Sequence, residues 1–447
     1  MLLHFGRVER FITKLKAVNE VVLNFNSSEE VAYIFTEDNA IAWSEGLGSL
    51  LNTIVERGCS SLQVRGLLKI MDVYREVTVM SPRSQPPSLL SRLKNLFTSA
   101  EFAPTPSVLA GQTWKYERNP HTNWSFSAPK DILTEFSPQA IAHSSLTHLT
   151  IGTKSFLCPP LLQWTYSALS TSPITDLTIE DVDFFGATWS ILSDLLPQAA
   201  PGLKGLKLRK CRGLSDKQVT QFIKGFPKLE RLSLEQLSSP WTDGLNPFAN
   251  SSNAVLPALA RLTTLRGEAK WILPALTSYS ASFPALQNLQ IVFSRGVRRS
   301  WTIVGDSDVR ALDDRCLLAE LTKLGPNPKF SVDIELLAPE DIVSWMRQAT
   351  EPITASGGTP EWMDCVSGII VVVDKRLEWS HEWKVKDTIR QWYQQFPRLK
   401  KLIIKSMVNE GYVVRSVEQF CQLKMSKVVK GLEDFEVNGR RWELSAE

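Results

Sequence analysis

Apolar residues recur along the chain in triplets, with two residues between the first and the second and one between the second and the third. The pattern is clearest in FPKLERLSL at residues 226–234, FPALQNLQI at 283–291 and FPRLKKLII at 396–404, with a near copy, PGLKGLKL, at 201–208. Proline ends a preceding helix because it lacks a backbone N–H and restricts the residue before it. The last two apolar residues of a triplet point the same way in a strand, which has a period of two. The pattern therefore predicts a short strand after each proline.

Looser copies of the triplet occur through much of the sequence. Four successive copies begin at Leu146, Ile174, Leu203 and Leu229, which are 28, 29 and 26 residues apart. This spacing is typical of leucine-rich repeats, whose period is about 20–29 residues. The predicted strands carry Val18/Val21/Leu23, Cys59/Leu62/Val64, Leu146/Leu149/Ile151, Ile174/Leu177/Ile179, Leu203/Leu206/Leu208, Leu229/Leu232/Leu234, Leu262/Leu265, Leu286/Leu289/Ile291, Val366/Ile369/Val371, Leu399/Leu402/Ile404 and Leu432/Phe435/Val437.

Helical patterns lie between these strands. Stripes with spacings of three and four residues predict helices over residues 47–55, 219–226 and 385–396. Ser215 and Gln218 have the spacing of a capping box at the start of the second helix. One repeat would then be strand, loop, helix, proline and the next strand, and each unit needs its neighbours to bury its apolar face. The predicted fold class is α/β, a leucine-rich-repeat solenoid with a curved parallel β-sheet on the concave side and helices on the convex side.

The regularity of the repeats divides the chain into four regions. We expect irregular repeats over residues 1–77, a Pro/Ser-rich insertion over 78–140, regular leucine-rich repeats over 141–295 and longer irregular repeats over 296–447. Within the insertion, Leu89, Leu90, Leu93, Leu96 and Phe97 predict a short amphipathic helix. Such a long insertion is either a flap that binds a partner or a plain surface loop.

Composition narrows the class of protein. Of the 447 residues, 43% are hydrophobic and 22% are charged, which predicts a folded protein. A net charge of +3 without a dense basic stripe argues against a nucleic-acid partner. The six cysteines are far apart, as in a protein of a reducing compartment, and no apolar run is long enough for a membrane span. We therefore expect a cytoplasmic or nuclear protein with no membrane partner.

The segment at residues 201–234 has a more specific pattern. It runs PGLKGLKLRKCRGLSDKQVTQFIKGFPKLERLSL, with Cys211 after the strand and Leu214, Ser215 and Asp216 before the helix. This resembles the cysteine-containing leucine-rich repeat of F-box substrate receptors, and SPITDLTI at 172–179 is similar to repeats of mushroom-type fungal F-box proteins. The resemblance implies a substrate receptor of an SCF-type ubiquitin ligase. The F-box module, which opens with a Leu-Pro-x-Glu-like phrase, is not found in this chain.

No motif for catalysis or for a cofactor occurs, so we predict no catalytic residue, cofactor or metal, and no enzyme activity. His143, His148 and Cys158 lack the convergent short spacings of a zinc site. Cys211 lies between Lys210 and Arg212, which favours a thiolate, but the repeat itself places a small buried residue there.

We call the apolar residues of each triplet its anchors. The side chains between the anchors are predicted to line the concave face and to contact a protein partner. Their charges alternate, which indicates either a mosaic contact surface or an ordinary solvated one. The predicted function is protein binding by an F-box-like receptor, or alternatively by a stand-alone scaffold without a link to ubiquitin. The ligand is an unknown protein, with a Skp-type adaptor only if an F-box exists upstream. The predicted contact residues are His148, Thr150, Asp176, Thr178, Glu180, Lys207, Arg209, Arg231, Ser233, Glu235, Asn288, Gln290, Lys401, Ile403 and Lys405.

Overall fold

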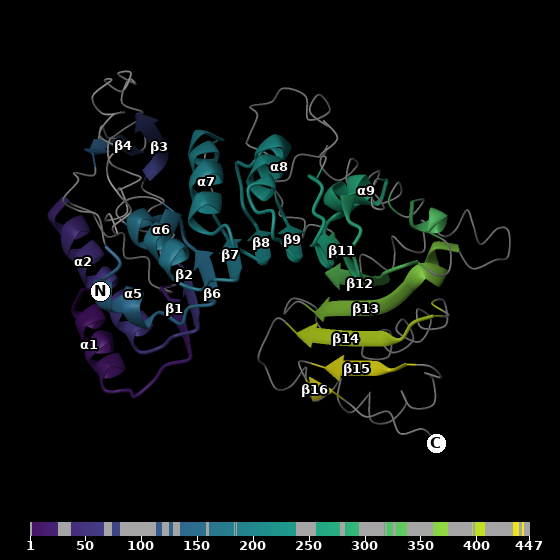
Figure 1. The fold of residues 1–447 in the computed structure, drawn as a ribbon, viewed down its shortest axis with the longest axis horizontal. Helices are drawn as coiled ribbons and strands as arrows, with labels where there is room; N and C mark the ends of the chain where they lie inside the picture. The colour runs from purple at the N-terminus through teal and green to yellow at the C-terminus, as the bar shows by residue number, and fades with distance from the viewer. Residues whose placement is uncertain are drawn as a thin grey trace, which may run out of the picture. The chain divides into compact units, whose positions relative to one another are not determined.

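The chain folds into two compact units, each built on its own set of parallel strands (Figure 1). Unit 1 comprises Met1–Leu229 and Leu237–Thr242, and unit 2 comprises Glu230–Gln236 and Asp243–Glu447. The computed structural model describes residues 2–25, 37–66, 74–80, 113–118, 125–127, 135–157, 161–182, 184, 186–237, 256–277, 282–294, 317, 320–324, 328–337, 361–373, 396, 398–406, 432–437 and 440–441.

Five parallel strands form the sheet of unit 1. Their order in the sheet is their order in the chain, and the second apolar anchor of each triplet stands level with that of its neighbour, which confirms the predicted stacking. The strands are β1 (Glu20–Asn24), β2 (Ser61–Arg65), β6 (His148–Gly152), β7 (Asp176–Glu180) and β8 (Gly205–Arg209). The row of second anchors consists of Val21, Leu62, Leu149, Leu177 and Leu206.

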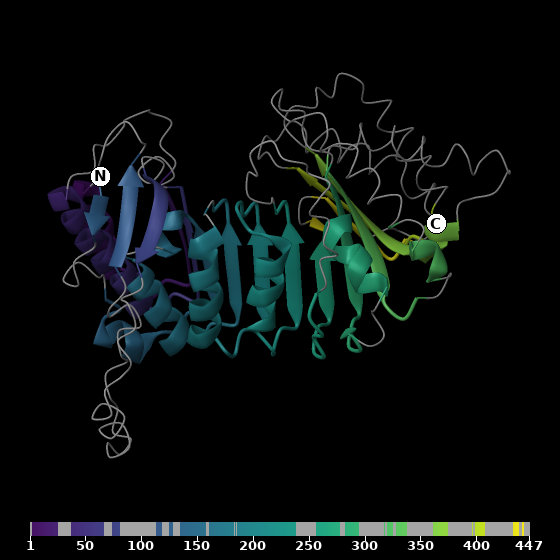
Figure 2. The same cartoon turned by 90° about the horizontal axis from the view of Figure 1, so that it is seen from above.

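Helices cover one face of this sheet, and α7 and α8 stand on the same side of β7 and β8 in both views (Figures 1 and 2). The predicted helix at residues 47–55 lies inside α2, and the one at 219–226 corresponds to α8, where the Ser215–Gln218 capping box is present. Val219, Phe222 and Ile223 of α8 are buried. The helices are α1 (Leu2–Thr13), α2 (Glu37–Glu56), α5 (Pro138–His143), the 3-10 helix η2 (Lys154–Leu157), α6 (Leu162–Thr171), α7 (Gly186–Ala199) and α8 (Asp216–Lys224).

A separate antiparallel sheet accompanies unit 1, and most of it falls within the predicted insertion at 78–140. It consists of β3 (Tyr74–Met80), β4 (Thr113–Arg118) and β5 (Ser125–Ser127), in that order. These strands were not predicted from the sequence. The amphipathic helix predicted at residues 89–97 lies outside the described residues.

Unit 2 repeats the parallel arrangement, and its strands β11 to β14 are longer than the parallel strands of unit 1. The strands are β9 (Arg231–Glu235), β10 (Thr264–Gly267), β11 (Asn288–Ser294), β12 (Ser331–Leu337), β13 (Val366–Val373), β14 (Lys401–Ser406) and β15 (Asp434–Val437), with β16 (Arg440–Arg441) antiparallel to β15. Leu232, Leu265 and Leu289 stand side by side, as predicted. The described helices are α9 (Ala269–Thr277) and the 3-10 helix η4 (Glu361–Cys365). The helix predicted at 385–396 lies, except for Phe396, outside the described residues.

Strand β12 was not predicted, and it changes the register of unit 2. Its triplet has Lys329 where other repeats have an apolar first anchor, so the pattern did not identify it. In the structure Ile334 pairs with Ile291 on one side and with Ile369 on the other. Ile369 is therefore level with the third anchor of β11, not with the second. A displacement of two residues keeps every side chain on its face, so the assignment of residues to the two faces of the sheet is unchanged.

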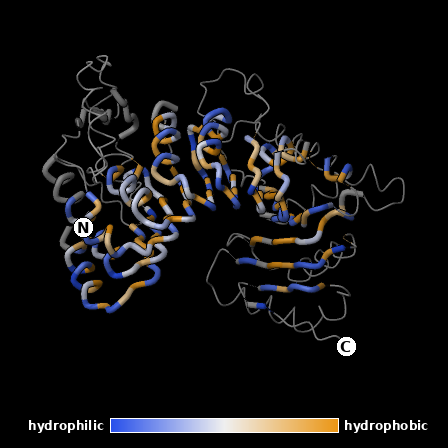
Figure 3. The backbone as a smooth tube through the Cα atoms, viewed as in Figure 1, coloured by the Kyte–Doolittle hydropathy of each residue, from blue (hydrophilic) through white to orange (hydrophobic). Residues whose placement is uncertain are grey.

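The strands begin with the same hydrogen bonds in both units. The carbonyl oxygen of Thr147 accepts from the N–H groups of Thr175 and Asp176, and that of Glu230 accepts from Thr263 and Thr264. These hydrogen bonds therefore join neighbouring repeats at the residues where their strands begin. Apolar and polar residues alternate along the strands, as Figure 3 shows, because anchors face the helices and the residues between them face away.

Candidate functional site

The face of each sheet that points away from the anchors is the candidate functional surface, and we call it the open face. From β2 to β8 its central row, at the level of Thr178, consists of half-buried polar side chains between buried apolar rows. Side chains two residues apart on one strand lie on the same face, so each strand contributes two or three of them. In unit 1 these residues are Glu20, Val22 and Asn24; Ser61, Gln63 and Arg65; His148, Thr150 and Gly152; Asp176, Thr178 and Glu180; Gly205, Lys207 and Arg209.

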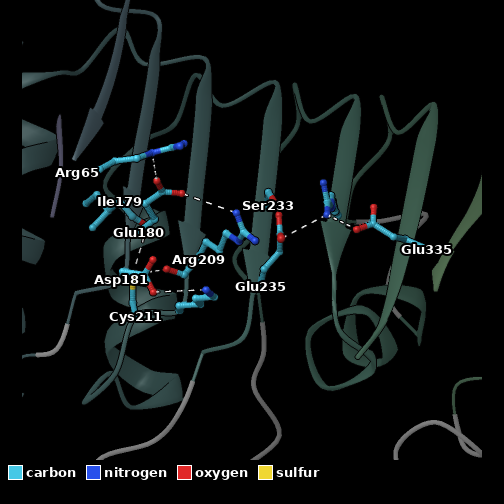
Figure 4. A network of polar contacts seen from close by, with 11 residues as sticks. Arg65, Ile179, Glu180, Asp181, Arg209, Cys211, Ser233, Glu235 and Glu335 are labelled. Atoms are coloured by element: carbon cyan, nitrogen blue, oxygen red, sulfur yellow. Dashed lines mark hydrogen bonds and ion pairs between the residues drawn. The ribbon is translucent and has the colours of Figure 1, made fainter. Parts of the chain in front are cut away.

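An ion network that includes Arg65, Glu180 and Arg209 occupies the carboxyl ends of the unit 1 strands. Arg65 Nε lies 2.7 Å from Glu180 Oε1, and Arg209 Nη1 lies 3.9 Å from Glu180 Oε2 (Figure 4). The side chain of Glu180 is 8% exposed, whereas those of Arg65 and Arg209 are 46% and 32% exposed. One buried carboxylate therefore holds two guanidinium groups near the surface.

Gly152 lies under the contact between Arg65 and Glu180, which reaches across an intervening strand. Arg65 is on β2 and Glu180 on β7, and the strand between them, β6, has Gly152 beside Arg65. A Cβ on Gly152 would lie 3.1 Å from Arg65 Cγ and 3.0 Å from the carbonyl oxygen of Val64. The side chain of Arg65 thus crosses β6 where there is no side chain to obstruct it.

Unit 2 contains a network of the opposite composition. Arg266 Nη2 lies 2.8 Å from Glu335 Oε1 and 3.3 Å from Glu235 Oε2 (Figure 4). Gln290 donates to Glu335 at 2.7 Å. The Glu235 and Glu335 side chains are 8% and 6% exposed and that of Arg266 is 22% exposed. Here one guanidinium lies between two buried carboxylates.

A glycine also lets a side chain cross a strand in unit 2. Asp333 on β12 pairs with Lys401 on β14, with Lys401 Nζ 3.0 Å from Asp333 Oδ2. Gly368 of β13 stands level with both, and a Cβ on it would overlap the Asp333 carboxylate. The two units therefore use the same arrangement with different residues.

The turns that follow the strands share a backbone conformation. Asp181, Lys210 and Gln236, each the first residue after its strand, have φ of 54°, 51° and 52°. Lys210 Nζ lies 3.7 Å from Asp181 Oδ1. Non-glycine residues seldom adopt positive φ, so its recurrence at one repeat position marks a common turn.

Cys211 follows this turn and lies inside the unit. Its thiol donates to the carbonyl oxygens of Ile179 at 3.4 Å and of Arg209 at 3.6 Å. Burial raises the pKa of the Cys211 thiol to about 12, and that of Cys59 and Cys365 to about 11 and about 12. At neutral pH these thiols are protonated, and a protonated thiol is a poor nucleophile and a poor metal ligand.

The structure places most of the predicted contact residues on the open face, but three of them are buried. Glu180 and Glu235 are each 6% exposed and Ile403 is 7% exposed. The two glutamates are buried under arginines, and Ile403 clusters with Ile370 and Val372. We therefore correct the expectation that these side chains meet a partner directly. Of the other predicted residues, His148, Arg231, Asn288 and Lys405 are exposed, and Thr150, Asp176, Thr178, Lys207, Arg209, Ser233, Gln290 and Lys401 are intermediate.

Several residues that organise the open face were not among the predicted contact residues. Arg65 and Arg266 lie on the outward face by the alternation of side chains along their strands. The repeats around them are weak or irregular and were not used to choose contact residues. Asp333 and Glu335 were missed together with β12. Applying the same alternation to every predicted strand would have identified both arginines as outward residues.

Neither a scan against protein-family models nor a search of curated proteins found a match for the chain. Within the described residues, no three His, Cys, Asp or Glu side chains form a group that could hold a metal ion. Over the same residues, no helix is both long and apolar enough to cross a membrane.

Proposed function

We propose that the protein is a leucine-rich-repeat protein that binds another protein through the open face of its sheet. The observation that carries the proposal is the stacked row Gln63, Thr150, Thr178 and Lys207, whose polar side chains remain half-exposed while the anchors on both sides are buried. Such a row offers hydrogen-bonding groups on a backbone fixed by strand pairing. A rigid surface loses little entropy when it binds.

A photo-crosslinking amino acid placed on either face tests this proposal. Thr178 reports on the open face, and Gln221, an exposed residue of α8, reports on the helix side. We expect a defined protein adduct from position 178 and none from position 221. The adduct protein, once identified and purified, should bind Thr178→Trp at least about tenfold more weakly than Gln221→Trp, because bulk at a contact position excludes a close partner. Equal adducts from both positions, or equal affinities, would reject the open face as the binding surface.

The resemblance to F-box receptors supports a narrower proposal, namely that the bound protein is a substrate of an SCF-type ubiquitin ligase. The buried position of Cys211, at the turn where the receptor repeats have their cysteine, agrees with it. The alternative is a scaffold without a link to ubiquitin. Co-purification of the natural full-length protein with a Skp-type adaptor distinguishes the two, since the receptor requires the complex and the scaffold does not form it.

A further inference from the structure

The outward side of helix α1, the first helix of unit 1, carries exposed basic and apolar side chains. Arg7, Phe11 and Lys14 follow one another at intervals of four and three residues, the spacing of one helix face. The N–H of Lys14 donates to the carbonyl oxygen of Phe11, so the turn continues just past the helix. Phe11 is 60% exposed and Val8, three residues before it, is 39% exposed. Arg10 is exposed as well. We call Arg7, Val8, Arg10, Phe11 and Lys14 the α1 surface.

The opposite side of α1 holds the helix on α2, beside which it lies in Figure 1. Phe5 and Ile12 on this side are 3% and 7% exposed. Glu9 accepts hydrogen bonds from the hydroxyl groups of Ser49 at 2.8 Å and of Thr53 at 3.4 Å, both on α2. Glu9 is the only acidic residue of α1 and it faces the fold, so the α1 surface contains no carboxylate.

The cations of the α1 surface are unpaired within the part of the chain that the structure describes. Arg7, Arg10 and Lys14 form no ion pair and no side-chain hydrogen bond there, and the same holds for the exposed Lys16 that follows them. These side chains therefore present positive charge to the solvent around the ring of Phe11.

The described carboxylates on the next two elements of the chain, β1 and α2, do not pair with these cations. Glu20 of β1 accepts a hydrogen bond from Gln63 at 3.0 Å, and Glu56 of α2 accepts one from Ser137 at 2.8 Å. Glu45 of α2 is exposed and forms no ion pair with a described residue. The α1 surface is thus a site at which a negatively charged partner would meet no competing ion pair among the described residues.

The spread of these charges fits a membrane that contains anionic lipids better than a protein. Arg7 and Lys14 are about 10 Å apart along the helix axis, at 1.5 Å for each residue, so the cations do not converge on one point. A fluid layer of anionic headgroups can place a negative charge beside each cation, whereas a protein would need carboxylates at matching positions. Basic residues beside an exposed aromatic ring are typical of helices that lie at a membrane surface.

We propose that the α1 surface contacts membranes that contain anionic lipids, with Arg7, Arg10 and Lys14 at the headgroups and Phe11 at the boundary with the acyl chains. The contact is shallow, because the other side of α1 stays packed on α2. The sequence predicted no membrane partner because no apolar run could span a bilayer, but contact with a membrane surface needs no such run. The inference is independent of the proposed function, since it uses no residue of the open face.

Co-sedimentation of the full chain with lipid vesicles tests the inference. The probes are vesicles of phosphatidylcholine mixed with phosphatidylserine, and the comparison vesicles contain phosphatidylcholine alone. We expect binding to the mixed vesicles, little binding to the neutral ones, and an affinity that falls as salt is raised, because exposed charges are screened. Absence of binding to the mixed vesicles at low salt, or equal binding to both kinds, would overturn the inference.

Charge variants assign the binding to the α1 surface. Arg7→Gln/Lys14→Gln should weaken binding to the mixed vesicles by about tenfold or more, since two cations leave the contact. Lys217→Gln/Lys224→Gln, which removes two exposed lysines from α8, is the matched control and should change the affinity by no more than about twofold. Both variants should melt at the temperature of the unaltered protein, because all four side chains are exposed. Equal losses of binding would show a general charge effect and overturn the inference.

Phe11→Ala separates apolar contact from charge. It leaves every cation in place and removes an exposed ring, and we expect the affinity for the mixed vesicles to fall by about fivefold, because the ring leaves water in the contact. Ile141→Ala is the matched control, since Ile141 is 44% exposed on α5 and is not part of the α1 surface. An unchanged affinity of Phe11→Ala would contradict the proposed place of Phe11 at the boundary with the acyl chains.

Two further measurements exclude the other surface and the other class of partner. Thr178→Trp, on the open face, should bind the mixed vesicles as the unaltered protein does, and a loss equal to that of Arg7→Gln/Lys14→Gln would overturn the inference. The second probe is a soluble amphipathic peptide of glutamate and leucine. Binding of this peptide without binding of the vesicles would assign the α1 surface to an acidic protein and overturn the inference.

Discussion

The ion networks of the two units are opposite in composition. In unit 1 one glutamate, Glu180, lies between Arg65 and Arg209, and in unit 2 one arginine, Arg266, lies between Glu235 and Glu335. In both networks the carboxylates are the buried members and the arginines are more exposed. The long arginine side chain can keep its charged head near water while its stem covers the sheet, but a glutamate that pairs with it is left underneath.

The difference determines what each network contributes. Unit 1 buries one carboxylate beneath two partly exposed arginines, so water can hydrate these cations if the carboxylate is removed. Unit 2 buries two carboxylates around one cation, so the stability of the folded state depends more on that cation. A buried charge that loses its partner costs much more free energy than an exposed one. The three predictions that follow test this contrast, in order of expected effect.

Arg266→Met should be the most destabilising of these changes. It keeps the stem of the side chain but removes the charge between Glu235 and Glu335, and we expect a loss of about 3 kcal/mol in the free energy of unfolding. Chemical denaturation of unit 2, followed through a local probe, measures it. Adding Glu335→Gln should restore part of the loss, because one buried negative charge disappears. If the second substitution makes the protein still less stable, the buried carboxylates are not the source of the cost.

Gly152 and Gly368, where a side chain crosses a strand, should differ in the stability lost on substitution by alanine. In Gly152→Ala the new methyl meets the backbone oxygen of Val64 as well as Arg65, so we expect a loss of about 1–2 kcal/mol. In Gly368→Ala the obstacle is the end of the Asp333 side chain, which can rotate away, and the loss should be about 1 kcal/mol or less. Lys401→Met should then add little to Gly368→Ala, because the pair with Asp333 is already broken. A larger loss at Gly368 than at Gly152 would reverse the predicted order.

Glu180→Gln should have the smallest effect on stability. Its partners Arg65 and Arg209 are partly exposed and can be hydrated when the carboxylate becomes an amide. We expect a change of about 1 kcal/mol or less in the free energy of unfolding, the range of partly exposed ion pairs. Thermal denaturation of Glu180→Gln and Arg266→Met under the same conditions compares the stability lost by the two variants. If Glu180→Gln destabilises as much as Arg266→Met, the proposed contrast between the units is wrong.

Much of the parallel sheet was predictable from the sequence. The apolar triplets located every strand of the parallel sheet of unit 1, and the row from Val21 to Leu206 follows from their register. The capping box at Ser215 also appeared as predicted, because it depends on residues only three positions apart. Strand β12 was missed because Lys329 interrupts its triplet, although Val332 and Ile334 are buried like any other anchors.

The candidate site was less predictable, for a physical reason. The alternation of residues along a strand predicts which face a side chain is on. It does not predict whether another side chain covers it. Glu180 was correctly placed on the outward face, yet Arg65 reaches it from two strands away, across Gly152. This contact joins residues more than a hundred positions apart, and a local pattern does not contain it.

Successive repeats lie side by side in the stated order, and a pair of double-cysteine variants tests this order most directly. Thr178 is level with Lys207 on the next strand, whereas Thr150 is two strands from Lys207. Neighbouring strands are about 4.8 Å apart, within the span of a disulfide, and strands separated by another are beyond it. Single-cysteine variants control for bonds to the native thiols. Mild oxidation should link Thr178→Cys/Lys207→Cys and leave Thr150→Cys/Lys207→Cys unlinked, and the reverse result would contradict the repeat order.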